Sequence, residues 1–226
     1  MTRGSKRWWL GAAAAVVLAV LLVILLRPNA PAANSIERLA VYHDAALLRQ
    51  AWAMPVARRY GPDGFISQRN PSVCGPTSIA DLLRSEGRSM SAEHVLDGTG
   101  IRSIFGLLPG GLTLDEEAAL LRLRTGEPVA VLRGLSLAAF RQEIARANDP
   151  ARRYVVNFTR EPLFGRGHGH FSPVLGYLPR RDLVFVGDVN DSYRPWLVPV
   201  ERLYAAQDTI DPATHAKRGL LRVATH

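Results

Sequence analysis

One segment near the N-terminus constrains the architecture of this 226-residue chain more than any other. Residues Trp8–Leu26 form an uncharged run rich in Ala, Val and Leu, and nineteen such residues are long enough to span a bilayer. Three basic residues precede the run and only Arg27 follows it closely, so the positive-inside rule predicts a cytoplasmic N-terminus. We expect residues 1–27 to be a single-pass inner-membrane anchor, with the rest of the chain in the periplasm.

A cleaved leader is the alternative to an anchor. Ala30-Pro31-Ala32 has the small-residue spacing of a signal peptidase site, and cleavage there predicts secretion to the periplasm. The apolar run is longer than the usual signal-peptide core, which favours an anchor. Residues 28–34 are expected to be a short linker, and residues 35–226 one folded domain, large enough to bury a core without disulfides or metal.

Charge and cysteine content exclude several classes of function. Half of the net charge of +8 comes from the four basic residues in the first 27 positions. The domain has no run of five basic residues, so no nucleic acid partner is expected. The single cysteine, Cys74, excludes an intrachain disulfide, and no Cys/His cluster has the spacing of a zinc site, so no metal-binding residues are expected.

The segment around Cys74 is typical of a nucleophile at the start of a helix. Pro76 is a good first-turn residue, and apolar side chains recur at helical spacing after it. The positive end of the helix dipole favours the thiolate, so the pKa of this thiol is expected to be lowered. Gln68, six residues upstream, is a candidate oxyanion donor. The alternative is a cysteine that acts as a small buried hydrophobe.

Apolar periodicity predicts an α/β fold, with helices first and strands later. Ser35–Trp52 has a helical stripe, Thr113-Leu-Asp-Glu116 is a capping box, and Ser136 can cap a further helix. Pro128–Leu132 and the runs beginning at Tyr154, His170 and Leu183 are typical of strands. A helical part that carries the cysteine is therefore expected to pack on an antiparallel sheet.

His170 and Asp188 are the candidate partners of the cysteine. A hairpin centred on Pro179 sets them directly opposite each other, with Cβ atoms roughly 5 Å apart. The carboxylate then orients the imidazole, which takes the proton of Cys74. His168 competes for the role of base. The alternative is a glycine-rich loop with solvent-facing histidines or a fortuitous metal site.

Several segments together resemble the catalytic domain of phytochelatin synthases, which belong to the papain-like cysteine peptidase clan. The resemblance spans about residues 60–226. The Gly-His-Phe-Ser-Pro block followed by an aspartate eighteen residues after the histidine is its most specific part. The matching segments are Gln68–Gly75, Val155–Phe158, Gly169–Val174 with Gly176-Tyr177, Asp188-Val189, and Asp208–Asp211 with Lys217–Gly219.

The resemblance implies a papain-like fold and assigns roles to the residues already singled out. Cys74 becomes the nucleophile, His170 the base, Asp188 the orienting residue and Gln68 the oxyanion donor. Glutathione is the implied substrate: the enzyme releases glycine, holds γ-glutamylcysteine as a thioester, and passes it to water or to a second glutathione. No cofactor is implied, although Cd or Zn ions can serve as activators or as thiolate complexes of the substrate.

Two more residues match family positions that bind the γ-glutamyl group. Asp211 suits its α-ammonium and Arg218 its α-carboxylate, although a salt-bridged turn explains the same pair. The sequence departs from the family at Asp191 and at residues 192–196, and it has no second cysteine to sense metal thiolates. We therefore expect hydrolysis before metal-activated polymerisation. The alternatives are a periplasmic papain-like peptidase or amidase, and a non-catalytic, membrane-tethered binding module.

Overall fold

The structure, a computed structural model, describes residue 16 and residues 31–225. The chain divides into two units, residues 1–31 and 32–226. The membrane run expected at residues 8–26 lies outside the described residues except for Val16. Within the described part, no helix is long and apolar enough to cross a membrane. The second unit holds every element discussed below.

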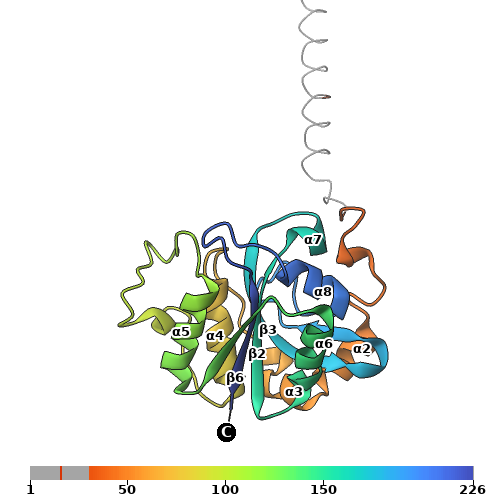
Figure 1. The fold of residues 1–226 in the computed structure, drawn as a ribbon, viewed down its shortest axis with the longest axis horizontal. Coiled ribbons are helices and arrows are strands. Elements are labelled where there is room, and N and C mark those ends of the chain that lie inside the picture. Colours follow the sequence, from red (N-terminus) through yellow and green to blue (C-terminus); the bar gives the residue numbers. More distant parts are fainter. Residues whose placement is uncertain (1–15, 17–30, 226) are drawn as a thin grey trace, which may run out of the picture. The chain divides into compact units, whose positions relative to one another are not determined.

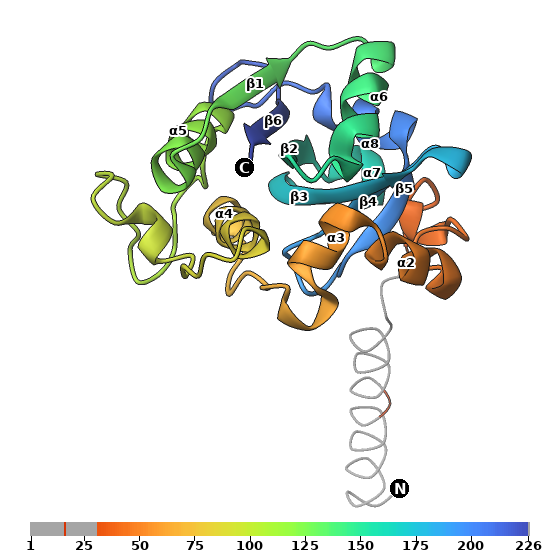
Figure 2. The ribbon, with the colours of Figure 1, turned by 90° about the horizontal axis from the view of Figure 1, so that it is seen from below.

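A six-stranded antiparallel sheet forms the centre of the second unit, with the strand order β1-β6-β2-β3-β4-β5 (Figures 1 and 2). The two central strands, β2 and β3, are buried along nearly their whole length, because helices cover both of their faces. The strands are β1 (Val129–Arg133), β2 (Arg152–Thr159), β3 (Gly169–Leu178), β4 (Leu183–Val186), β5 (Trp196–Pro199) and β6 (Gly219–Ala224).

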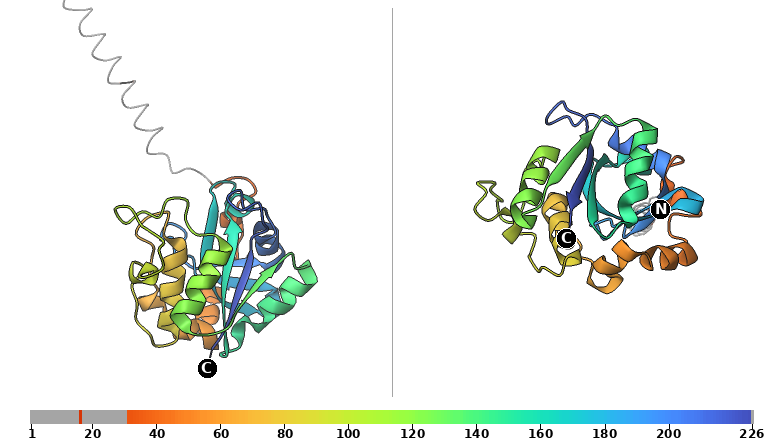
Figure 3. Two further views of the ribbon diagram at one scale, coloured as in Figure 1. Left: turned by 60° about the vertical axis from the view of Figure 1, so that its left-hand side comes forward. Right: turned by 60° about the horizontal axis from the view of Figure 1, so that its bottom comes forward.

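Helices cover both faces of this sheet, as the views in Figures 2 and 3 show. On one face lie α2 (Ala45–Trp52), α3 (Pro55–Tyr60), α4 (Cys74–Ser85) and α5 (Leu114–Thr125), and on the other α6 (Leu137–Ala145), α7 (Glu161–Phe164) and α8 (Val200–Gln207). Short 3-10 turns are Ile36–Arg38, Pro62–Gly64, His94–Leu96, Arg146–Asn148 and Pro179–Arg181.

The alternation of side chains along β2 explains the two layers. Val155 packs with α4 and α5, whereas Tyr154, Val156 and Phe158 pack with α6, α7 and α8. A smaller apolar cluster joins α2 and α3 to the far end of the sheet. The expected α/β fold, with a helical part carrying the cysteine packed on an antiparallel sheet, is confirmed.

Local signals located most elements correctly. The capping box at Thr113 is present, with both of its reciprocal hydrogen bonds, and Ser136 caps α6. The single helix expected over Ser35–Trp52 is wrong. A 3-10 turn covers Ile36–Arg38, and α2 begins only after Asp44, whose carboxylate accepts the backbone N–H of Leu47. Because Asp44 caps a new helix, the helical periodicity does not continue unbroken from Ser35, and a separate helix begins at Ala45.

Candidate active site

Cys74 is the first residue of α4, as the sequence predicts. Its N-cap, Val73, makes no side-chain cap bond, so the first turn offers free backbone donors. The thiol is 6% exposed and interacts with the backbone N–H groups of Gly75 and Phe171. Because Phe171 follows His170 on β3, the thiol lies where α4 meets the start of β3.

The expected lowering of the Cys74 pKa is wrong. Burial raises the pKa of this thiol to about 11, which outweighs the backbone N–H groups that favour the thiolate. Burial also lowers the pKa of His170, and the nearby charge of Arg160 lowers it further. The resting pair is therefore a neutral thiol and a neutral imidazole, and the thiolate forms only as the proton moves to the base.

His170 and Asp188 form a buried pair. Nε2 of His170 lies 3.0 Å from Oδ1 of Asp188, and both side chains are almost fully buried. Because the neutral imidazole donates Nε2–H to the carboxylate, Nδ1 is left as the acceptor for a proton. His168 is exposed, and its carbonyl accepts the backbone N–H of Arg160. Of the two histidines, only His170 has the geometry of an oriented base.

The carboxylate of Asp188 has three further donors. Nη2 of Arg160 lies 2.7 Å from Oδ1, Nε1 of Trp196 donates to Oδ2 at 2.9 Å, and the backbone N–H of Asn190 donates to Oδ1 at 2.9 Å. Burial by itself raises the pKa of Asp188, but the hydrogen bonds from His170 and Arg160, together with the charge of Arg160, hold it well below its usual range. The carboxylate therefore stays ionised beside the imidazole.

The hairpin that joins these residues differs from the expected one. β3 and β4 pair Tyr177 with Val184, so the turn centres beyond Pro179, and a bulge follows between Val174 and Gly176. The ladder ends before Asp188, which reaches His170 from the segment after β4. The predicted direct cross-strand pairing is therefore wrong, although the predicted contact exists. The shifted turn alone would place the side chains of His170 and Asp188 on opposite faces of the sheet. The bulge adds one residue to β3 and returns them to the same face.

Gln68 lies on the loop that enters α4. Its backbone N–H donates to the carbonyl of Val189 at 2.7 Å, next to Asp188 in the chain. Two residues earlier, the backbone N–H of Ile66 donates to Asp81 of α4 at 2.8 Å. Side-chain Oε1 of Gln68 is buried and has no hydrogen-bond partner among residues 31–225. The loop is thus tied at two points, to the segment after Asp188 and to α4.

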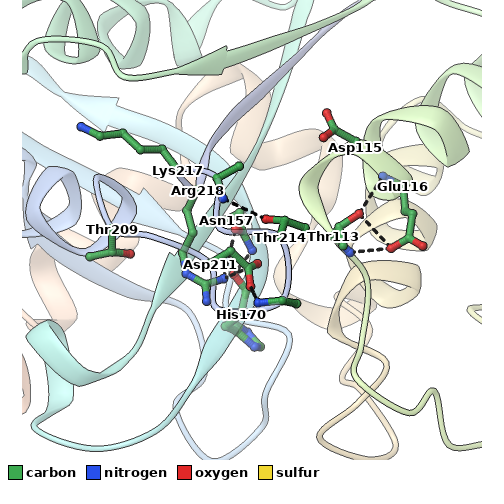
Figure 4. A network of polar contacts seen from close by, with 12 residues as sticks. Thr113, Asp115, Glu116, Asn157, His170, Thr209, Asp211, Thr214, Lys217 and Arg218 are labelled. Atoms are coloured by element: carbon green, nitrogen blue, oxygen red, sulfur yellow. Dashed lines mark hydrogen bonds and ion pairs between the residues drawn. The ribbon is translucent and has the colours of Figure 1, made fainter.

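Asp211 and Arg218 line the same cleft as Cys74. The cleft has a volume of about 350 Å³ and includes Gly111, Asn157 and Gly169 in its walls. Figure 4 shows Asp211, Arg218, Asn157 and His170 close together. Nη1 of Arg218 lies 3.1 Å from Asp211 and 3.2 Å from Oδ1 of Asn157.

The position of the Arg218 guanidinium depends on a glycine. A Cβ atom added to Gly169 would lie 2.6 Å from Nη1 of Arg218, so the guanidinium fits only against glycine. Nε of Arg218 is buried and has no hydrogen-bond partner within residues 31–225. Burial lowers the pKa of Arg218. The cleft therefore presents a carboxylate and a forked cation beside the thiol.

Sequence reasoning missed three residues of the site: Arg160, Trp196 and Asn157. Arg160 is 5% exposed, and its guanidinium carbon lies 3.9 Å from the centre of the Tyr193 ring. Asn157 donates to the carbonyl of His170 at 3.3 Å. The available signal in the sequence was the presence of polar residues next to buried apolar ones: Asn157 lies within β2, and Arg160 directly follows that strand. Across residues 31–225, no group of three or more His, Cys, Asp or Glu side chains is arranged to hold a metal ion.

The sequence is similar to those of known proteins. The family model described as Phytochelatin synthase matches residues 33–220. Glutathione gamma-glutamylcysteinyltransferase 1 of Arabidopsis thaliana is 31% identical over 174 residues, covering 71% of this chain and 35% of its own length. The protein of the same name from Triticum aestivum is 34% identical over 174 residues, covering 71% and 34%.

Other matches are shorter or more distant. Glutathione gamma-glutamylcysteinyltransferase 3 of Lotus japonicus is 35% identical over 118 residues, covering 50% of this chain and 24% of its own length. The chain thus spans between about a quarter and a third of these three relatives. Among solved structures, the peptidase domain of Streptococcus ComA has a TM-score of 0.49 and 15% identity, covering 71% of this chain and 97% of that domain.

Proposed function

The chain belongs to the phytochelatin synthase family, and from this premise we propose that it is a thiol-dependent enzyme that cleaves the Cys–Gly bond of glutathione. One observation carries the proposal. The Asp211–Arg218 pair lines the same cleft as the thiol of Cys74, and the buried His170–Asp188 pair is one residue from Phe171, whose backbone N–H interacts with that thiol. The curated relatives are named glutathione gamma-glutamylcysteinyltransferases, which supports the same substrate.

The first half of the proposed reaction forms a thioester. Nδ1 of His170 takes the thiol proton, and the Cys74 sulfur attacks the carbonyl carbon of the substrate's cysteine residue. The backbone N–H of Cys74 and the carboxamide of Gln68 donate to the oxyanion. As the C–N bond breaks, the imidazolium returns its proton to the nitrogen of the departing glycine. γ-Glutamylcysteine is then held on Cys74.

The second half resolves the thioester. His170 takes a proton from water, the hydroxide attacks the thioester carbon, and the C–S bond breaks to release γ-glutamylcysteine and the Cys74 thiolate, which regains the proton. If the amine of a second glutathione replaces water, the product is a phytochelatin. We propose hydrolysis as the main outcome, because Asp191 and residues 192–196 depart from the family's sequence after the aspartate.

Recognition of the γ-glutamyl end is assigned to the pair on the other side of the cleft. The α-ammonium of glutathione suits the Asp211 carboxylate, and its α-carboxylate suits the forked guanidinium of Arg218. In the structure these two side chains bind each other at 3.1 Å, and the zwitterionic substrate replaces that contact with one to each partner. An ordinary α-peptide lacks this pair of charges on its acyl side.

We propose that the enzyme acts in the periplasm, attached to the inner membrane by residues 8–26 or secreted after cleavage. The apolar run and the excess of basic residues before it support this location. Fractionation of cells that express the full chain with a C-terminal tag tests it. A protease-accessible tag in intact spheroplasts is expected, whereas a tag that resists protease until lysis contradicts the proposal.

Product analysis tests the activity. The full chain is incubated with glutathione, with and without Cd²⁺ or Zn²⁺, and glycine and thiol peptides are followed by mass spectrometry. We expect glycine and γ-glutamylcysteine from the wild type and neither from Cys74→Ala. (γ-Glu-Cys)₂-Gly identifies transfer to a second glutathione, and its formation only with Cd²⁺ or Zn²⁺ identifies a metal-dependent transfer. Unchanged glycine release by Cys74→Ala overturns the proposal.

A further inference from the structure

Glu117 is a buried acidic residue that the proposed reaction does not use, and it lies beside the turn that carries Cys74. Glu117 is on the first turn of α5, and its side chain is 0% exposed. It belongs to the stripe of α5 that faces the core, together with Leu114, Ala118 and Leu121. Neither carboxyl oxygen has a hydrogen-bond partner within residues 31–225. A charge left in this way is costly, and an apolar residue is the usual occupant of such a position.

The carboxyl group touches the turn that carries Cys74. A Cβ atom added to Gly75 would lie 2.4 Å from Oε2 of Glu117, so the carboxyl lies directly against the backbone of Gly75. The backbone N–H of Gly75 interacts with the thiol of Cys74. The thiol of Cys74 and the carboxyl of Glu117 are therefore both close to Gly75 in the first turn of α4.

The Cys74 thiol and the Glu117 carboxyl disfavour each other's ionisation. The positive end of α4 stabilises one anion in its first turn, but two anions this close repel each other in a buried site. A charged Glu117 raises the pKa of Cys74, and burial raises the pKa of Glu117 itself to about 8. At neutral pH the carboxyl is mostly protonated and leaves the thiolate unopposed, whereas at alkaline pH it ionises and opposes the thiolate.

Other charged groups around these two residues are engaged elsewhere or act on the thiol alone. The elements packed against α5 are α4, β1, β6 and the turn at His94–Leu96. Their remaining titratable side chains have partners away from Glu117: Asp81 with Ile66, Arg84 with Tyr60, Arg133 with Asp115, Arg222 with Glu143, and His94 with Ser91. Across the cleft, the charges of Arg160 and Arg218 also interact with Cys74.

We propose that Glu117 is a positioning residue that acts through Cys74: its protonated carboxyl permits the thiolate, and its ionisation at alkaline pH suppresses it. The inference rests on the proposed function only in treating Cys74 as the nucleophile. It predicts that the reactivity of the thiol rises less steeply with pH than that of an isolated buried thiol. A purely structural role of Glu117 predicts no such pH dependence.

The test measures alkylation of Cys74 by iodoacetamide, a neutral reagent, in the full chain between pH 6.5 and pH 9.5. Because Cys74 is the only cysteine, the rate reports this thiol alone. We expect Glu117→Gln to react at the wild-type rate at pH 6.5 and about tenfold faster at pH 9.5, which corresponds to a thiol pKa lower by about one unit. A ratio of variant to wild-type rates that does not change with pH overturns the proposal.

Two further variants support the interpretation. Asp115→Asn removes an exposed carboxylate two residues away on the same helix, visible beside Glu116 in Figure 4, and is expected to react like the wild type at each pH. Glu117→Met replaces the carboxyl with an apolar side chain of similar length, keeps the site packed, and is expected to show the same rising ratio as Glu117→Gln. A rising ratio without glycine release from glutathione in any variant rejects the proposed function and leaves this inference standing.

Discussion

Replacing Arg160 by methionine removes a permanently charged partner of Asp188, which is nearer to its carboxylate than His170 is. The two side chains are 2.7 Å apart and almost fully buried. At an effective dielectric constant of about 20, this separation corresponds to roughly 6 kcal/mol of Coulomb attraction. Asp188 keeps its contacts with His170, Trp196 and Asn190, so we expect a smaller loss of about 3–5 kcal/mol in the free energy of unfolding, the range for breaking a buried pair.

The effect of Arg160→Met on folding depends on pH in a definite direction. The pKa of Asp188 is lower in the folded state than in the unfolded chain, so its contribution to stability is present at neutral pH and lost in acid. The variant should therefore be most destabilised above about pH 5, and the difference from the wild type should shrink as Asp188 titrates at lower pH. Urea unfolding at several pH values measures this.

Arg160→Met is also expected to change the pKa of the proposed base, His170. Because Arg160 lowers the pKa of His170, its removal raises that pKa, and the acidic limb of kcat/KM should move to higher pH. Arg166→Met is the matched control, since its guanidinium is half-exposed and 3.4 Å from Glu37; it should cost less than about 1 kcal/mol. Equal stability of the two variants, or an unmoved acidic limb in Arg160→Met, refutes the reasoning.

Three further predictions concern other contacts of the site. Arg218→Lys keeps the charge but loses the fork, so KM for glutathione should rise by about tenfold or more while kcat changes less; an unchanged KM contradicts the assignment. Trp196→Phe removes a donor to Asp188, so guanidinium unfolding at pH 7 should show a loss of about 1.5–3 kcal/mol, and no loss would mean that the bond is dispensable. The wild type should lose stability relative to Glu117→Gln as pH rises from about 4.5 to about 8, because the pKa of Glu117 is raised in the folded state; parallel melting temperatures across this range contradict that.

The parts of the site that could be predicted from sequence depend on local signals. Pro76 and the periodicity after it locate the start of α4, and the capping box at Thr113 locates α5. Cys74 begins a helix, Gln68 lies on the loop before it and His170 lies on a strand, as the sequence predicts. The Cys74 thiol interacts with the backbone N–H of Phe171, the residue after His170. Asp211 and Arg218 form the ion pair that the alternative of a salt-bridged turn predicts, because a short turn joins the two residues; their binding of the γ-glutamyl group stays a prediction.

Other features depend on packing between distant segments. Arg160 contacts Asp188 across 28 positions, and nothing near Arg160 in the sequence indicates a buried partner. Gly176 within β3 is compatible with a bulge, but no local signal fixes the centre of the turn after Pro179, so the register of the β3–β4 hairpin could not be predicted. The helix dipole predicts a lowered pKa for the Cys74 thiol, but burial of the thiol by the surrounding fold raises that pKa instead. Glu117 has the appearance of an ordinary acidic residue in a first helical turn, and only the packing of α5 on α4 buries it.

The central claim is that Cys74 carries γ-glutamylcysteine as a thioester. Acid quenching within the first turnovers after mixing the full chain with glutathione preserves such an adduct, and intact-protein mass spectrometry detects it. We expect an increase in mass equal to glutathione minus glycine on the wild type, located on Cys74 by peptide mapping and absent from Cys74→Ala. Glycine release by the wild type with no adduct on Cys74 at any quench time would contradict the account.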